Sequence, residues 1–218
     1  MADAAFHLPV WFDLGATFAF GITGALAGIK RGYDIVGVFF LALFSSIGGG
    51  LIRDGIFIPS NTATPLLTDA RYIQVIVLAT VIGALFGRHV KRFYRVVALI
   101  DALGLGAYAA FGTQKALQFE LAVPAAVLIG VINAAGGGLL RDIITREEPL
   151  VFRPGQFYVL TAVAGAVTFV FFSVSLDLTA TFSALIAIAV TFTFRVLTIV
   201  FNWRTTPVAP PEERDLTP

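Results

Sequence analysis

The chain has 218 residues, of which 57% are hydrophobic and 13% charged, and its mean hydropathy is +0.87. A water-soluble domain of this composition would need an implausibly large dry core, so the composition predicts an integral membrane protein. The formal net charge of +1 does not indicate nucleic-acid binding, and a chain without cysteine has no disulfide, thiolate metal site or cysteine nucleophile. No metal or cofactor is expected, because the two histidines, His7 and His89, are far apart.

Seven apolar stretches are long enough to cross a bilayer, which predicts an all-α membrane protein with seven transmembrane helices. A crossing helix needs about 20 apolar residues, and a helix satisfies all its backbone groups internally. The predicted spans are Val10–Ile29, Ile35–Ile58, Tyr72–Arg88, Val96–Phe111, Leu121–Ile144, Phe157–Leu176 and Leu178–Phe201. The segment 1–9 carries no Lys or Arg, which argues against a cleaved signal peptide, and the Pro-rich tail 205–218 is expected to be disordered.

One motif occurs twice within these spans. Three glycines are followed by two aliphatic residues, Arg and Asp at residues 48–54 and again at residues 136–142, which is a shift of 88 positions. Glycine weakens a helix and exposes its backbone groups, so we expect both triplets to interrupt their spans. The alternative is that the glycines only permit close helix packing. The candidate hinge residues are Gly48, Gly49, Gly50, Gly136, Gly137 and Gly138.

The same shift relates positions outside the glycines. It places Asp13 over Asp101 and Gly24 over Gly112 without a gap. The chain therefore divides into a three-helix unit at residues 10–88, a second unit at 96–176 and a seventh helix at 178–201. Because three is odd, the second unit is expected to be inverted in the membrane, and inverted repeats with broken helices are typical of proteins that move solutes. The alternative is an old duplication that was kept only for packing.

The distribution of Lys and Arg predicts the orientation. With seven spans, one face of the membrane collects Lys30, Arg31, Arg88, Lys91, Arg92, Arg95, Arg141, Arg146, Arg153, Arg204 and Arg214. The other face collects only Arg53, Arg71 and Lys115. The basic face should be cytoplasmic, so the N-terminus is expected outside and the C-terminal tail in the cytoplasm.

Each unit should carry charged residues near one mouth of the bundle. The two groups are Asp13, Arg53 and Asp54 near the outer face, and Asp101, Arg141 and Asp142 near the inner face. Charges at membrane depth are costly unless they are paired or hydrated, so we expect Asp13 to pair with Arg53, and Asp101 with Arg141, beside a water-filled path. The alternatives are an Asp that stabilises a helix dipole and an Arg that extends its head group to the interface.

Polar groups near the glycines could extend this path. Ser45, Ser46 and Asn133 precede the two triplets and either line the path or bond across helices. A break at the glycines would free backbone carbonyls, which could replace the hydration shell of a cation or orient a small polar solute.

The repeated motif and the helix count resemble the prokaryotic members of the trimeric intracellular cation (TRIC) channel family, over about residues 10–201. The resemblance implies a homotrimer in the plasma membrane of a bacterium or archaeon. Each subunit would have its own pore, bounded by the second and fifth helices and kinked at residues 48–50 and 136–138. The permeant species would be monovalent cations, potassium or sodium, with potassium preferred. Related bacterial sequences are also linked to uptake of small amino acids such as glycine.

Two functions therefore lead, a monovalent cation channel first and a carrier for a small neutral amino acid second. A channel predicts unitary currents in a bilayer, and a carrier predicts saturable uptake without them. An enzyme is not expected, because the sequence has no nucleophile–base pair and no metal cluster. A purely structural protein would not need repeated charges beside hinges.

Overall fold

The structure is a computed structural model that describes residues 6–58, 64–87, 94–154, 157–203 and 205–206. Its elements are α1 Val10–Lys30, α2 Ile35–Ile52, the π-helical turn η2 Arg53–Phe57, α3 Pro65–Thr68, α4 Ala70–Phe86, α5 Tyr94–Gln118, α6 Val123–Ile144, α7 Tyr158–Val170, the π-helical turn η4 Phe171–Ser175 and α8 Ala180–Val200. Residues 88–93 and 204, which carry several of the basic residues of the predicted cytoplasmic face, and residues 207–218 of the predicted tail lie outside the described residues.

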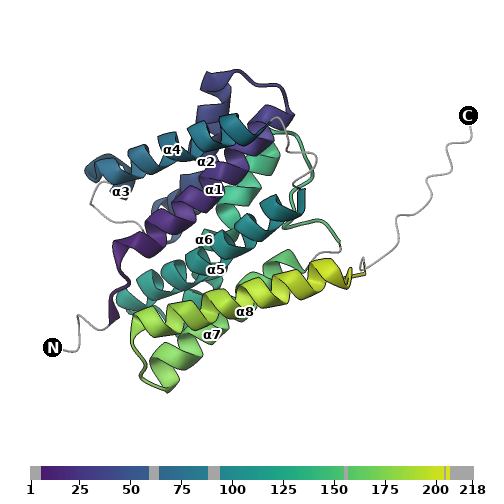
Figure 1. The fold of residues 1–218 in the computed structure, drawn as a ribbon. Helices are drawn as coiled ribbons and strands as arrows, with labels where there is room; N and C mark the ends of the chain where they lie inside the picture. Colours follow the sequence, from purple (N-terminus) through teal and green to yellow (C-terminus); the bar gives the residue numbers. More distant parts are fainter. Residues whose placement is uncertain (1–5, 59–63, 88–93, 155–156, 204, 207–218) are drawn as a thin grey trace, which may run out of the picture.

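The helices form one bundle, with α1 and α5 at its centre (Figure 1). Helix α1 packs on α2, α4 and α5, whereas α5 packs on α6, α7 and α8. In Figure 1, α2, α3 and α4 lie beyond α1 on one side, and α7 and α8 lie beyond α5 on the other. The chain is therefore arranged as two helix groups that meet where α1 contacts α5 and α2 contacts α6.

The predicted spans agree with the observed helices. Within the described residues, six helical segments are long and apolar enough to cross a membrane, and α4, with 17 residues, is a shorter apolar helix. Their outward faces carry large apolar side chains, such as Phe40 on α2 and Leu85 on α4. The chain is therefore an all-α integral membrane protein.

Helix α5 extends beyond the predicted end of the fourth span at Phe111. The polar residues Thr113, Gln114 and Lys115 follow Phe111 in the sequence. Thr113 and Gln114 are buried in the structure, and the Thr113 hydroxyl donates to the Ala109 carbonyl at 2.8 Å. Because the bundle satisfies these polar groups, the helix continues to Gln118.

The predicted interruption at the glycines was wrong. Helices α2 and α6 run as α-helix through both triplets, so the expected free carbonyls are not produced there. The irregular segment of the second span comes after the glycines, where η2 begins at Arg53. Packing explains the difference, because the first two glycines of each triplet lie against the other helix, where the absence of a side chain leaves room for the partner backbone.

Candidate functional site

Helices α2 and α6 cross in close backbone contact at their glycines. A Cβ on Gly49 would stand 1.8 Å from the Asn133 carbonyl oxygen, and a Cβ on Gly137 would stand 2.1 Å from the Ser45 carbonyl oxygen. Gly48 and Gly136 also lie against the opposite helix. Only residues without a side chain fit this crossing, which we call the glycine crossing.

The contacts at the crossing are reciprocal. The pair Gly49 and Asn133 becomes the pair Gly137 and Ser45 when each residue is exchanged for its counterpart 88 positions away. The helices around the crossing follow the same rule, because Gly24 of α1 lies against Ser45 and Gly112 of α5 lies against Asn133. Such exchange is the pattern of a contact across a two-fold axis.

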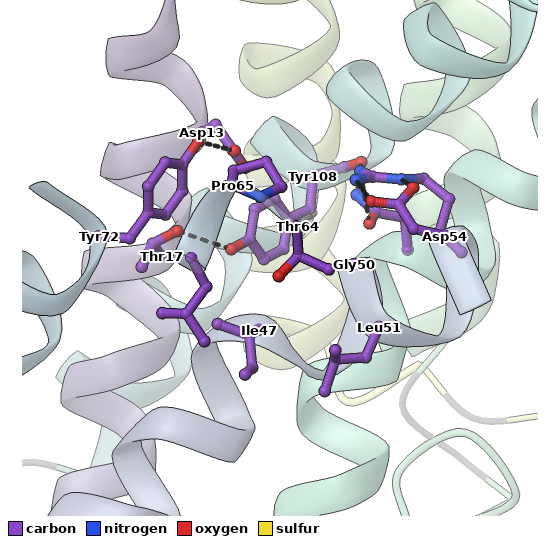
Figure 2. Close-up of a pocket in the computed structure, with 13 residues that line it drawn as sticks. Asp13, Thr17, Ile47, Gly50, Leu51, Asp54, Thr64, Pro65, Tyr72 and Tyr108 are labelled. Carbon is purple, nitrogen blue, oxygen red and sulfur yellow. Dashed lines mark hydrogen bonds and ion pairs between the residues drawn. The ribbon is translucent and has the colours of Figure 1, made fainter. Parts of the chain in front are cut away.

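One cavity lies beside the crossing at the C-terminal end of α2, and we call it the Arg53 cavity. It has a volume of about 50 Å³ and is lined by Asp13, Arg53, Asp54, Tyr72 and Asn133, among others. Figure 2 shows Asp13 and Tyr72 on one side of it and Asp54 on the other, with Gly50 between them. A space of this size can hold a few water molecules, and its lining supplies the polar partners that water needs.

The Arg53 guanidinium contacts Asp54, Asn133 and the Phe111 ring. Its Nε and Nη2 donate to the two carboxylate oxygens of Asp54 at 2.6 and 2.7 Å, and its Nη1 donates to Asn133 Oδ1 at 3.0 Å. Lys115 Nζ lies 3.0 Å from both Asp54 oxygens, and the Arg53 guanidinium lies 5.5 Å from the centre of the Phe111 ring. These contacts fix the guanidinium inside the protein, where Arg53 is only 4% exposed.

The predicted ion pair between Asp13 and Arg53 was wrong. In the described part of the chain, Arg53 pairs with Asp54, and Asp13 accepts a hydrogen bond from the Tyr72 hydroxyl. Both side chains still line the same cavity. The adjacent Asp54 binds the guanidinium through two hydrogen bonds, a geometry that the Asp13 carboxylate on another helix does not provide. Asp13 therefore bonds to Tyr72.

A second cavity, which we call the Arg141 cavity, lies at the α6 end of the crossing. It has a volume of about 160 Å³, and its lining includes Thr23, Lys30, Asp101, Arg141, Glu147 and Arg195. Arg141 Nη1 lies 3.0 Å from Asp101 Oδ1 and 3.1 Å from the Thr23 hydroxyl, and its Nε lies 3.0 Å from Asp142 Oδ1. The structure thus places the predicted pair of Asp101 and Arg141 in direct contact.

Glu147 crosses the rim of the Arg141 cavity. Its Oε1 lies 3.1 Å from Lys30 Nζ and 3.2 Å from Arg31 Nη2, so it joins the segment after α6 to the end of α1. Partial burial raises the pKa of Glu147, but the Lys30 hydrogen bond and the positive charges nearby outweigh this effect and lower the pKa below its ordinary value.

Between the cavities the bundle is packed. The Tyr108 hydroxyl donates to the Ser46 carbonyl at 2.6 Å and lies 2.9 Å from the Thr17 hydroxyl, and its ring stacks on Phe20 at 5.3 Å. The Ser46 hydroxyl donates to the Thr17 carbonyl at 2.9 Å. The two cavities are therefore separate in this conformation.

Sequence reasoning missed several residues that hold the two clusters: Thr17, Thr23, Tyr72, Tyr108 and Lys115. The sequence places Tyr72 only at the start of the third predicted span and Lys115 only among the basic residues of the outer face. A polar residue inside an apolar helical face was the available signal at Thr17 and Thr23, but the sequence does not identify the partner. The partners come from other helices, at separations such as 59 residues for Tyr72 and Asp13.

A family of sequences described as "Glycine transporter" matches residues 10–88 and 98–174. The chain belongs to this family. A UPF0126 membrane protein of Deinococcus radiodurans is 34% identical over 157 residues, covering 72% of each chain. Bacillus subtilis YvgT, also a UPF0126 membrane protein, is 29% identical over 188 residues, covering 85% of this chain and 89% of the relative.

Solved structures of TRIC channels share the fold. The TRIC orthologue from Rhodobacter sphaeroides superposes with a TM-score of 0.80 at 27% identity, covering 88% of this chain and 97% of that chain. Another TRIC cation channel superposes with a TM-score of 0.80 at 28% identity, covering 94% of this chain and 98% of the other. The predicted membership in the TRIC family is confirmed.

Proposed function

We propose that this TRIC family member conducts monovalent cations, potassium in preference to sodium, along a path that joins the Arg53 and Arg141 cavities through each subunit. The observation that carries the proposal is that two polar, charged cavities lie at the two ends of the glycine crossing. Charged groups at membrane depth are expensive, and in membrane proteins they mark ion and substrate pathways. The fold shared with solved TRIC cation channels supports the same function.

The path would open by movement of α2 against α6. Glycine-to-glycine contacts allow two helices to slide or separate without unlocking side chains, and this replaces the broken-helix hinge expected from sequence. In the open form Gly50 and Gly138, which sit at the cavity ends of the crossing, would line the path together with Ser45, Ser46 and Asn133. The charged residues at the mouths would be Asp13, Arg53 and Asp54 at one end and Asp101, Arg141 and Asp142 at the other.

The two three-helix units would be an inverted repeat, followed by α8 as a seventh helix. The reciprocal contacts at the crossing support this arrangement, as does the match of the family in two stretches, residues 10–88 and 98–174. An inverted pair gives a path whose two ends are built from the same parts, which suits alternate opening at the two faces.

In the membrane, the Arg53 cavity would face outward and the Arg141 cavity would face the cytoplasm. The excess of Lys and Arg at the Arg141 end supports this orientation. We further propose that the protein is a homotrimer in a bacterial or archaeal plasma membrane, because its structural neighbours include a trimeric channel and its relatives are bacterial.

A second candidate is a carrier for a small neutral amino acid such as glycine. The family description favours it, and both cavities present acidic and basic groups to a zwitterion. A carrier would expose one cavity at a time, whereas a channel must connect both at once.

The test is reconstitution of the full chain. In a planar bilayer under a potassium gradient, a channel gives unitary currents that reverse near the potassium equilibrium potential. Vesicles loaded from the same preparation are assayed for radiolabelled glycine uptake that saturates and is competed by unlabelled glycine. Saturable uptake without unitary currents would overturn the channel proposal in favour of the carrier.

A further inference from the structure

The two cavities reach the glycine crossing to different extents. Gly50 lines the Arg53 cavity. Its counterpart 88 positions away is Gly138, which is not among the described residues that line the Arg141 cavity. Asn133 likewise lines the Arg53 cavity, whereas its counterpart Ser45 is fully buried and does not line the other one. The Arg141 cavity therefore ends before it reaches the glycine crossing.

The side chain of Tyr158 occupies the space beside Gly138, where the Arg141 cavity ends. Its hydroxyl lies 3.1 Å from the point where a Cβ of Gly138 would stand, and the residue is 2% exposed. Tyr158 is the first residue of α7, directly after Phe157, whose φ of 50° is left-handed. The chain thus turns sharply just before the tyrosine and directs the ring into the bundle beside α6.

The hydroxyl of Tyr158 has no hydrogen-bond partner among the described residues. The same is true of the Ser45 hydroxyl. A buried polar group without a partner destabilises the conformation that buries it. Both groups lie on the Arg141 side of the crossing, which is where a wetted path would give them partners.

Arg195 of α8 bears on the same ring. Its guanidinium carbon lies 5.2 Å from the centre of the Tyr158 ring, and its side chain also lines the Arg141 cavity. A guanidinium over an aromatic face is attractive, more so where both are desolvated. Arg195 therefore connects the cavity wall to the tyrosine and brings the seventh helix, outside the repeated units, into contact with the path.

We propose that Tyr158 is the barrier between the Arg141 cavity and the glycine crossing, and that Arg195 holds it in place. When the ring moves aside, the cavity extends to Gly138 and Ser45, and their surroundings take up water and the permeant cation. The inference rests on the proposed function, because a barrier matters only if a path exists. In the first half, Tyr72 near the start of the third helix lines the Arg53 cavity, but its hydroxyl donates to Asp13, whereas the Tyr158 hydroxyl has no partner among the described residues.

The experiment uses the absence of cysteine in the chain. Ser45→Cys places a reporter thiol beyond the barrier, and Ala27→Cys places one on the lining of the Arg141 cavity. A charged, membrane-impermeant thiol reagent is added to the cytoplasmic side of oriented vesicles that contain the full-length protein. We expect rapid modification of Ala27→Cys and slow modification of Ser45→Cys. Tyr158→Ala should accelerate modification of Ser45→Cys several-fold and leave the rate at Ala27→Cys unchanged.

Two further variants separate the ring from the hydroxyl and from its support. Tyr158→Phe keeps the ring, so Ser45→Cys should remain slow, and this variant tests the barrier even if Tyr158→Ala does not fold. Arg195→Gln removes the stacked cation and should accelerate labelling of Ser45→Cys by a smaller factor than Tyr158→Ala. Equal slow labelling in Tyr158→Ala and the parent, with Ala27→Cys still reactive, would overturn the barrier.

Currents distinguish failure of this inference from failure of the proposed function. With a channel, Tyr158→Ala raises the open probability several-fold, and Leu160→Ala on the exposed face of α7 leaves it unchanged. If no variant and no parent protein carries current but labelling still depends on Tyr158, the channel assignment fails and the barrier stands. Parent currents with no response to Tyr158→Ala in either assay would overturn the barrier alone.

Discussion

The Arg53 and Arg141 cavities contain the same repeated residues, but the residues are paired differently. In the Arg53 cavity, Asp54 binds both Arg53 and Lys115, and Asp13 is left to Tyr72. In the Arg141 cavity, Arg141 binds Asp101 and Asp142 together.

The difference lies outside the repeated motif. Lys115 has no basic counterpart in the first unit, since the residue 88 positions earlier is Ala27. Because Lys115 is present, Asp54 binds two cations. The Arg141 cavity has no cation at the position equivalent to Lys115, so Arg141 binds two carboxylates. A duplicated motif therefore supplies the charges, and unrepeated neighbours decide how they pair.

The largest expected effect concerns the feature that the two halves share, the glycine crossing. Gly49→Ala and Gly137→Ala each force a methyl group to within about 2 Å of a carbonyl oxygen on the other helix. Because backbone must move, each change should destabilise the protein by about 3 kcal/mol or more, at the upper end of overpacking effects. The measurement is the thermal unfolding midpoint in detergent.

Gly50→Ala is the matched control, because the nearest atom to its Cβ is Arg53 Nη2 at 3.7 Å. It should unfold near the parent temperature. If Gly49→Ala unfolds with Gly50→Ala, the crossing is looser than described. If only one of Gly49 and Gly137 is sensitive, the crossing is not equivalent in its two halves.

The second prediction separates the two cavities. Arg141→Gln removes the guanidinium that pairs with Asp101 and Asp142, and loss of one member of a buried ion pair destabilises by about 3–5 kcal/mol. Arg53→Gln should cost less, because Lys115 remains beside Asp54 and Tyr72 still bonds Asp13. Unfolding midpoints of the two variants, measured side by side, test the difference.

A double variant provides the control for this prediction. Adding Asp101→Asn to Arg141→Gln removes one of the uncompensated charges and should recover part of the lost stability. Equal midpoints for Arg53→Gln and Arg141→Gln would show that the different pairings have no energetic consequence.

Much of this fold could be predicted from the sequence, because the length and apolar character of its segments indicate the membrane-spanning helices. The seven helical segments and the positions of the charged residues follow from hydropathy and from the shift of 88 positions. The same reasoning predicted the pair of Asp101 and Arg141, which the structure has, and the pair of Asp13 and Arg53, which it does not have. The continuous α-helix of α2 through its glycines could not be predicted. Three glycines either break a helix or let it pack closely, depending on the helix that lies against them, and the contact residue Asn133 is far away in the chain.

The roles of Tyr72, Tyr158 and Lys115 could not be predicted for a related reason. Each acts through a residue on another helix, and the sequence gives no partner. Tyr72 and Tyr158 occupy similar places at the starts of the third helices of the two units, yet one hydroxyl is bonded to Asp13 and the other has no partner among the described residues. That contrast emerges only when the neighbouring helices are in place.

The third prediction tests the tyrosine of the Arg53 cavity. Tyr72→Phe removes the hydroxyl that donates to Asp13 and leaves that buried carboxylate without its donor. The loss should be about 1.5–3 kcal/mol, the usual range for a hydrogen bond to a charged group. Tyr33→Phe, at an exposed position, is the control and should leave the unfolding midpoint unchanged.

If Asp13 instead finds Arg53 once Tyr72 is removed, the midpoint of Tyr72→Phe will stay close to the parent. The double variant Tyr72→Phe/Asp13→Asn should then lose no further stability relative to Asp13→Asn alone. If Tyr72→Phe has an unchanged midpoint but the double variant is much less stable than Asp13→Asn, the pairing of Tyr72 with Asp13 is contradicted.

The smallest expected effect is at the rim of the Arg141 cavity, where Glu147 contacts Lys30 and Arg31. The pKa of Glu147 is lowered in the folded protein, so its charged form stabilises the fold above the ordinary glutamate pKa of 4.5. This contribution is lost as the pH falls through the lowered value. Because the side chain is 41% exposed, water and salt screen the contact, and Glu147→Gln should shift the unfolding midpoint only slightly at pH 7. This shift should shrink in high salt and vanish at acidic pH. The control Glu120→Gln, in the exposed turn after α5, should change the unfolding midpoint under neither condition. A difference between Glu147→Gln and the parent that persists at acidic pH would mean that the Glu147 side chain acts through packing.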